Sequence, residues 1–300
     1  AGLACADVLA RLGVEVHVID RAPVAGGLLS LGIPAFKLPR GIVARRVKLL
    51  EDAGVRFALG ISVGKDVAWR DLANEFDAVF AGTGAARPVT LDLPGADNAS
   101  VMTADVFLRA VAAKDWKLPD ASFPIETLKG RRVSVLGGGD TALDCARTAV
   151  RLGAASVSLV ARRAKDALRA RPSDLARAET EGVSLLCGRT FSSLSISPDG
   201  TLNGLALRNV ANPDEPSETL PADVVIVAYG FRPVPDGELQ TLGVAYDDAG
   251  RIVTDDEGST SAPKLWAGGD AVRGPTLVNR ALADGRRAGL SIATAIGVLR

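Results

Sequence analysis

The stretch from Val133 to Ala142 reads VSVLGGGDTA, and it decides the fold. An apolar run typical of a buried strand leads into a G-x-G-x-x-A turn and then into a helical pattern, which is the context that the dinucleotide-binding fingerprint requires. Gly137 lets the chain turn sharply, Gly139 lets backbone N–H groups approach a pyrophosphate, and Ala142 lets the helix pack closely. Because a helix N-terminus also attracts phosphate, the sequence predicts dinucleotide binding at this turn.

The strand that follows this helix ends in Ala161-Arg162-Arg163. A carboxylate at this position would bind the ribose hydroxyls of NAD(H), whereas a pair of guanidinium groups can bind a 2′-phosphate through charge-assisted hydrogen bonds. We therefore expect NADP(H) at this turn, with Arg169 and Arg171 close enough to add to the phosphate pocket. The alternative interpretation is a solvated basic strand end.

The start of the chain shows the second half of a similar unit. Residues 2–12 have helical apolar spacing, and the following strand-like run VEVHVI ends at Asp20, where a ribose-binding acid is expected. The chain opens mid-pattern, so we expect the first strand of this unit to be missing. Further strand-like runs precede residues 82 and 228, and a long helical pattern covers 276–298. This alternation predicts an α/β fold with parallel sheets and helices on both faces.

The composition excludes several function classes. The 300 residues are 47% hydrophobic with no formal net charge, which indicates about two globular domains and no global basic field for nucleic acid. No apolar run is long enough for a membrane helix, and the N-terminal residues lack the build of a signal peptide. Cys5, Cys145 and Cys187 form no C-x-x-C pair and no metal-ligand spacing, which indicates a cytoplasmic protein without a metal site. His17 is the only histidine, so a Ser-His-Asp or Cys-His mechanism is not expected.

Several longer motifs carry a family resemblance. They are GGLLSLGIPAFKLP (residues 26–39), VGKDV (63–67), DAVFAGTGA (77–85), VLGGGDTALDCARTAVRLGA (135–154), AYGFRP (228–233) and WAGGDAVRGPTLV (266–278). Together they closely resemble the glutamate synthase small-subunit family, which includes the flavin- and NADPH-binding part of dihydropyrimidine dehydrogenase. The resemblance implies two Rossmann-like domains of the glutathione-reductase type. An FAD-binding domain (residues 1–88 and 233–300) is interrupted by an NADPH-binding domain (residues 89–232).

The resemblance also implies site residues for each cofactor. Positions matching FAD contacts are Gly2, Asp20, Gly27, Leu28, Leu29, Lys37, Val63, Gly269 and Asp270. Positions matching NADPH contacts are Gly137, Gly139, Asp140, Thr141, Ala142, Arg162, Arg163, Arg169, Ala228, Tyr229 and Gly230. No catalytic side chain is expected, because the flavin carries the chemistry.

The function implied is an NADPH-dependent FAD oxidoreductase module. Hydride passes from NADPH to FAD, and electrons leave for iron–sulfur centres of a partner domain or of a large catalytic subunit. One alternative is the electron-input part of a pyrimidine dehydrogenase, because ALRARPSDLARAETEGV (residues 167–183) resembles that version. A second is a thioredoxin-reductase-type disulfide reductase, which the absence of C-x-x-C argues against. A third is a nucleotide-binding fragment without catalysis.

Overall fold

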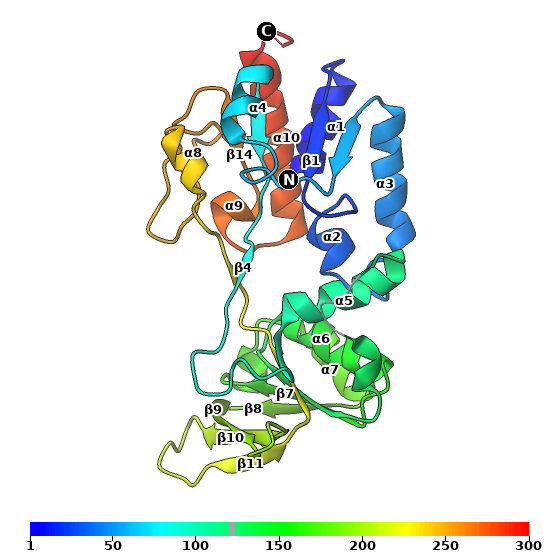
Figure 1. The fold of residues 1–300 in the computed structure, drawn as a ribbon, viewed down its shortest axis with the longest axis vertical. Coiled ribbons are helices and arrows are strands. Elements are labelled where there is room, and N and C mark those ends of the chain that lie inside the picture. Colours follow the sequence, from blue (N-terminus) through cyan, green and yellow to red (C-terminus); the bar gives the residue numbers. More distant parts are fainter. Residues whose placement is uncertain (120–123, 300) are drawn as a thin grey trace. The chain divides into compact units, whose positions relative to one another are not determined.

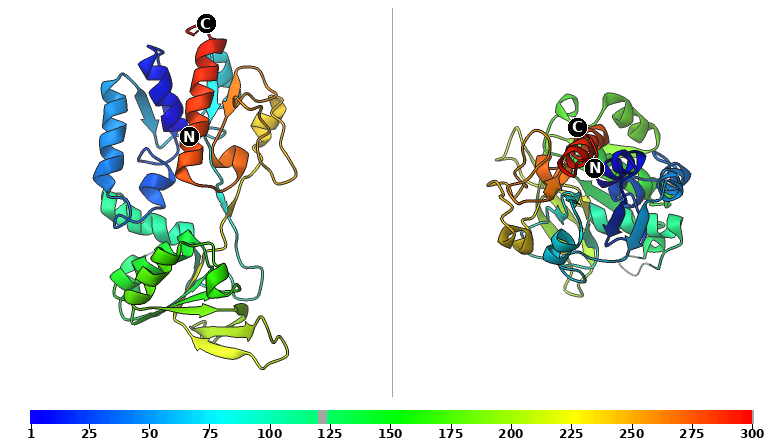
Figure 2. Two further views of the ribbon diagram at one scale, coloured as in Figure 1. Left: turned by 180° about the vertical axis from the view of Figure 1, so that it is seen from behind. Right: turned by 90° about the horizontal axis from the view of Figure 1, so that it is seen from above.

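The computed structural model describes residues 1–119 and 124–299 and divides into two compact units (Figures 1 and 2). Unit 1 contains Ala1–Ser30, Pro39–Arg87 and Phe231–Arg300, and unit 2 contains Leu31–Leu38 and Pro88–Gly230. The short strands β4 (Arg87–Pro88) and β13 (Phe231–Arg232), which lie at two of the boundaries between the units in sequence, pair with each other. One short segment, Leu31–Leu38, lies between stretches of unit 1 in sequence but packs with unit 2.

Unit 1 combines parallel strand pairs with helices. The strand β1 (His17–Asp20) pairs in parallel with β2 (Arg56–Leu59), and β3 (Val79–Ala81) pairs in parallel with β14 (Leu265–Ala267). The helices are α1 (Gly2–Arg11), α2 (Leu28–Leu31), α3 (Arg40–Asp52), α4 (Trp69–Glu75), α8 (Gly237–Thr241), α9 (Asp270–Arg273) and α10 (Val278–Ala295). The single long helix expected over 276–298 is therefore shorter at both ends, and a separate turn of helix precedes it.

Helices α1 and α10 lie side by side in both views of Figure 2 and form the centre of unit 1. Their axes approach closely because α10 presents glycine at the contact. A Cβ atom on Gly285 would overlap the carbonyl oxygen of Ala1, and one on Gly289 would lie 3.0 Å from the Cβ of Val8. This close packing fixes the N-terminus of α1 against the adjoining strands.

Unit 2 is built on a five-stranded parallel sheet with the order β5-β12-β6-β7-β8. Its strands are β5 (Val101–Thr103), β6 (Arg132–Leu136), β7 (Ser156–Ala161), β8 (Val183–Cys187) and β12 (Val224–Val227). The helices are α5 (Ala104–Trp116), α6 (Asp140–Arg151) and α7 (Pro172–Thr180), with 3-10 turns at Ile125–Leu128 and Lys165–Ala167. A three-stranded antiparallel sheet contains β9 (Arg189–Ile196), β10 (Leu202–Asn209) and β11 (Glu218–Pro221).

The order of the parallel strands places a topological switch point at β6. The chain proceeds from β6 to β7 and β8 on one side, while β12 and β5 lie on the other side. All four residues of β12 and the last four of β6 are buried, as expected for strands covered on both faces. In open α/β sheets ligands bind outside the carboxyl ends of the strands at such a point. In this unit that position is the glycine turn after β6.

Candidate functional site

The turn after β6 has the backbone that the fingerprint requires. Gly137 has a φ of +146°, and a Cβ there would lie 2.5 Å from the carbonyl oxygen of Ala228 at the end of β12. A Cβ on Gly138 would lie 2.6 Å from a methyl group of Leu168. In contrast, a Cβ on Gly139 would meet no atom within 4 Å. Two of the glycines therefore serve close packing, and Gly139 borders open space.

Helix α6 begins directly after this open position. Gly139 is its N-cap residue and no side chain caps the helix, so its first N–H groups have no side-chain acceptor. Asp140 is exposed, Thr141 is half-buried and Ala142 is fully buried against the turn. The arrangement leaves backbone donors facing outward at the positions predicted for a pyrophosphate.

The arginines after β7 are free to bind an anion. Arg162, Arg163 and Arg169 are exposed, and none of them forms an ion pair within residues 1–119 and 124–299. Since β7 neighbours β6, Arg162 and Arg163 follow the strand next to the glycine turn. Their lack of carboxylate partners is what a phosphate-binding pair requires.

The end of β12 lies on the other side of the turn. The N–H of Ala228 donates to the carbonyl oxygen of Leu136 at 2.8 Å, and the Ala228 carbonyl faces Gly137. Burial raises the pKa of Tyr229 above its ordinary value, and the nearby charge of Arg162 opposes this shift. Gly230 follows with a positive φ of +96°. Unit 2 therefore brings the predicted residues of this strand end to the same turn as Gly137.

A second convergence of glycines occurs in unit 1. A Cβ on Gly82, after β3, would lie 3.2 Å from the backbone nitrogen of Gly2. A Cβ on Gly269, after β14, would lie 3.0 Å from the Cβ of Ala1. The N-terminus of α1 thus meets the carboxyl ends of two parallel strands. The sequence did not single out Gly82 as a site residue, although the GTG turn after a buried strand was a usable signal.

The two acidic residues predicted as FAD contacts in unit 1 lie at the first residue of α9, after β14, and at the last residue of β1. Asp270 accepts hydrogen bonds from the N–H and the hydroxyl of Thr276, at 3.1 and 3.2 Å, and burial raises its pKa. Asp20 is half-buried at the end of β1, where its Oδ1 accepts from the N–H of Ala22 at 2.9 Å. Val63 is half-buried and forms an isolated parallel bridge with Val67.

The remaining predicted flavin contacts lie on and after α2. Gly27 has a φ of +55° with open space around it, Leu28 is 41% exposed and Leu29 is half-buried. Lys37, in contrast, packs with unit 2, where its Nζ lies 2.7 Å from Oδ1 of Asp144. The role of Lys37 as a flavin contact stays a prediction.

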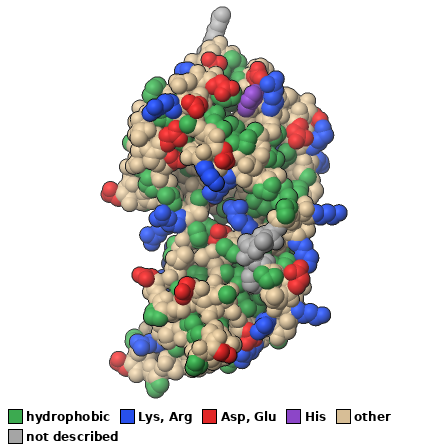
Figure 3. All heavy atoms as spheres, in the orientation of Figure 1, with side chains coloured by type: hydrophobic (Ala, Val, Ile, Leu, Met, Phe, Trp, Pro, Cys, Tyr) green, Lys and Arg blue, Asp and Glu red, His purple; other side chains and the backbone are tan. Residues whose placement is uncertain are grey.

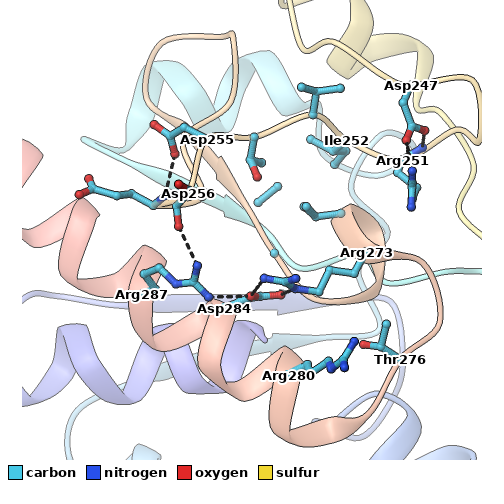
Figure 4. Close-up of a pocket in the computed structure, with 17 residues that line it drawn as sticks. Asp247, Arg251, Ile252, Asp255, Asp256, Arg273, Thr276, Arg280, Asp284 and Arg287 are labelled. Atoms are coloured by element: carbon cyan, nitrogen blue, oxygen red, sulfur yellow. Dashed lines mark hydrogen bonds and ion pairs between the residues drawn. The ribbon is translucent and has the colours of Figure 1, made fainter.

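Sequence reasoning missed one carboxylate next to Gly269. Asp284, on α10, accepts from the Gly269 N–H at 3.1 Å, from Nε and Nη2 of Arg273 at 2.7 Å each, and from Nη2 of Arg287 at 3.2 Å. Burial raises the pKa of Asp284, but the hydrogen bonds from Arg273 and Gly269 and the charge of Arg287 outweigh burial and lower it overall. Figure 4 shows these side chains at the floor of a pocket of about 490 Å³. Asp284 therefore holds the turn that carries Gly269 and Asp270.

The cysteines and the histidine do not form a reactive centre. All three cysteines are unpaired; burial raises the pKa of Cys5 to about 12 and raises those of Cys145 and Cys187. His17 lies on β1, where its ring hydrogen-bonds Glu15.

Over residues 1–119 and 124–299, no cluster suited to a metal and no helix able to cross a membrane is found. On the face shown in Figure 3, basic and acidic side chains are interspersed.

Comparison with known proteins agrees with this geometry. The family described as pyridine nucleotide-disulphide oxidoreductase matches residues 1–285. The glutamate synthase [NADPH] small chain of Halomonas elongata is 39% identical over 97% of this chain and 65% of its own length. The putative glutamate synthase [NADPH] small chain of Cereibacter sphaeroides is 39% identical over 97% of this chain and 73% of its own. The chain spans about half to two thirds of the length of several relatives it matches.

Among solved structures, FprA of Mycobacterium tuberculosis in complex with NADPH has a TM-score of 0.77 at 20% identity, covering 98% of this chain and 82% of that one. This likeness confirms the expected Rossmann-like α/β fold. The matched family and the relatives also support the expectation of an oxidoreductase that uses FAD and NADPH. The chain belongs to the pyridine nucleotide-disulphide oxidoreductase family and, within it, to the group of the glutamate synthase small chains.

Proposed function

We propose that the chain is an electron-input module that accepts hydride from NADPH onto FAD and passes electrons to iron–sulfur centres of a larger catalytic partner. One observation carries this proposal: each unit places glycines at the carboxyl ends of parallel strands, beside the N-terminus of a helix of ten or more residues. Two such turns in one chain are what two dinucleotide cofactors require.

Unit 2 is the proposed NADPH domain. The open position at Gly139 and the N–H groups that begin α6 fit a pyrophosphate, and the unpaired Arg162, Arg163 and Arg169 fit a 2′-phosphate. Ala228, Tyr229 and Gly230, at the end of the neighbouring strand, are the proposed contacts on the nicotinamide side. The preference for NADPH over NADH therefore depends on the arginines and not on the glycine turn.

Unit 1 is the proposed FAD domain. The N-terminus of α1 at Gly2, with Gly82 and Gly269 beside it, fits the flavin pyrophosphate because small residues leave the backbone accessible. Asp20, at the end of β1, is the proposed partner of the adenosine ribose, and Val63 is proposed to contact adenine. Asp270 is proposed to bind the ribityl or pyrophosphate region. Gly27, Leu28 and Leu29 are proposed to line the flavin.

When bound, the flavin supplies the redox chemistry by accepting a hydride and releasing single electrons. The chain's own residues bind and orient the two cofactors, so no acid–base side chain is required for the transfer. The high pKa values of the buried cysteines argue against a disulfide reductase, which needs a reactive thiolate. The three unpaired cysteines are consistent with a cytoplasmic protein, because thiols stay reduced in that compartment.

The test is anaerobic reduction of the flavin. The complete natural chain is purified, loaded with FAD and mixed with NADPH or NADH without oxygen, while the visible absorbance of the flavin is followed. We expect rapid bleaching with NADPH and slow bleaching with NADH. A protein that binds NADPH but retains no flavin would be the nucleotide-binding fragment without catalysis. Retained flavin that neither nucleotide bleaches would refute the proposed reaction.

A further inference from the structure

The two acidic residues of α6 have different electrostatic surroundings. Asp140 is the first residue of this helix, and Asp144 follows one turn later. Asp144 is buried, and its Oδ1 lies 2.7 Å from Nζ of Lys37, which belongs to the same unit. Asp140 is exposed, and within residues 1–119 and 124–299 it has neither a hydrogen-bond partner nor an ion-pair partner. Helix α6 therefore begins with a carboxylate whose charge no cation in the described chain neutralises.

The carboxylate of Asp140 does not use the backbone donors beside it. Elsewhere in the molecule an acid does cap a helix: Oδ1 of Asp236 accepts from the N–H groups of Glu238 and Leu239 at the start of α8, at 2.9 and 3.2 Å. At the start of α6 the N-cap is Gly139, and no side chain bonds to the first N–H groups. A Cβ on Gly139 would meet open space. The donors of α6 thus remain available to an anion, with an unneutralised carboxylate next to them.

The position of Asp140 has opposite consequences for the empty and the occupied turn. A negative charge in the first turn stabilises a helix, because it lies at the positive end of the helix dipole. A pyrophosphate bound at the same end interacts favourably with the same dipole and with the free N–H groups. Two negative groups at one helix end repel each other. The charge that stabilises α6 in the empty protein therefore opposes the binding of a pyrophosphate.

The arginines after β7 are proposed to act on a different part of the nucleotide. Arg162, Arg163 and Arg169 are the proposed partners of the 2′-phosphate, which NADPH has and NADH lacks. Both nucleotides contain the pyrophosphate, and so does the oxidised product NADP⁺. An effect of Asp140 on the pyrophosphate must therefore be equal for all three nucleotides, whereas an effect on the 2′-phosphate must spare NADH. This difference separates the role of Asp140 from that of the arginines.

We propose that Asp140 limits the affinity of the glycine turn for its nucleotide: its unneutralised charge repels the pyrophosphate of the reduced and the oxidised nucleotide alike. This inference rests on the proposed function, because it presupposes that the turn before α6 binds NADPH. Asp140 is neither a catalytic residue nor a selector between NADPH and NADH. A limit on affinity favours the release of NADP⁺, which has to leave before the next NADPH binds.

The test compares Asp140→Asn with the control Asp71→Asn, which removes an exposed acid from the first turn of α4, in unit 1. Titration at low salt is expected to show that Asp140→Asn binds NADPH, NADP⁺ and NADH about fivefold more tightly than the wild type, while the control is unchanged. The gain is expected to shrink as salt rises, because salt screens exposed charges. The thermal midpoint of the nucleotide-free protein is expected to fall by about 2 °C in both variants, since each helix loses an acid from its first turn.

The outcomes separate this inference from the function on which it rests. If the wild-type protein binds none of the three nucleotides, the proposed function is wrong and this role of Asp140 falls with it. If the wild type binds them and Asp140→Asn binds them equally well or more weakly, only the limit on affinity is wrong. A gain that spares NADH, or one that salt leaves unaltered, would also overturn it. If Asp140→Asn does not fold, Asp140→Ser, whose neutral side chain suits a helix start, decides the question by the same titrations.

Discussion

The two glycine turns of this protein are built in different ways. In unit 2, Gly137 and Gly139 are two residues apart, and strand, turn and helix follow one another in sequence. In unit 1, Gly2, Gly82 and Gly269 come from three distant stretches that meet only after the strands have paired. A turn encoded in one stretch depends on few other parts of the fold. A turn assembled from three stretches depends on every contact that holds them together.

The largest expected effect on stability separates the two kinds of glycine within unit 2. Gly137→Ala places a Cβ 2.5 Å from a carbonyl oxygen at a φ of +146°, so it should lower the free energy of unfolding by about 2 kcal/mol or more. Gly139→Ala meets open space and should change stability by less than about 0.5 kcal/mol, yet weaken NADPH binding about tenfold. Urea unfolding and nucleotide titration measure the two effects. Equal destabilisation by both substitutions would show that Gly139 also serves packing.

The arginines after β7 test whether the local turn alone sets cofactor choice. Replacing Arg162 and Arg163 with glutamine should remove charge-assisted contacts of about 1.5–3 kcal/mol each from NADPH binding. NADH binding should be unchanged, because NADH has no 2′-phosphate. Titration of the double variant with each nucleotide checks this. Equal losses for both nucleotides would show that these side chains do not recognise the 2′-phosphate.

The same difference explains how much could be predicted from sequence. The turn at Val133–Ala142 and the helix after it were predictable because apolar strand, glycines and helix are neighbours in the chain. Gly82 and Asp284 were not singled out, because their roles depend on contacts with Ala1, Gly2 and Gly269 that only the assembled sheet creates. The ion pair of Lys37 could not be predicted from its motif for the same reason: its partner, Asp144, lies 107 residues away. A site whose residues are neighbours in the chain can be recognised from sequence, whereas contacts between residues distant in the chain cannot.

Asp284 tests how far the assembled turn of unit 1 depends on one contact. Asp284→Asn removes the charge that holds Arg273 and Arg287, and it weakens the acceptor of the Gly269 N–H. The substitution should therefore lower the free energy of unfolding by about 1–2 kcal/mol. It should also lower the amount of flavin that stays bound after purification. Because the pKa of Asp284 is lowered, its contribution is present above the ordinary carboxyl pKa and is lost as pH falls through the lowered value. Flavin content and unfolding at several pH values measure both effects. Unaltered flavin retention would show that the turn is held by the sheet alone.

The smallest effect on cofactor binding is expected from the corresponding carboxylate of unit 2. Glu181 is also held by two arginines, which lower its pKa to about 2, but it contacts α6 behind the glycine turn. Its stabilisation is present above its ordinary pKa of about 4.3 and is lost as pH falls toward the lowered value. Glu181→Gln should therefore lower the unfolding free energy by about 1–2 kcal/mol at neutral pH, with the difference from wild type vanishing in acid. Nucleotide affinity should be unchanged, since the turn of unit 2 is held by its own backbone. Urea unfolding across this pH range and NADPH titration at neutral pH measure the two effects. Weakened NADPH binding would mean that the turn of unit 2, like that of unit 1, depends on a distant carboxylate.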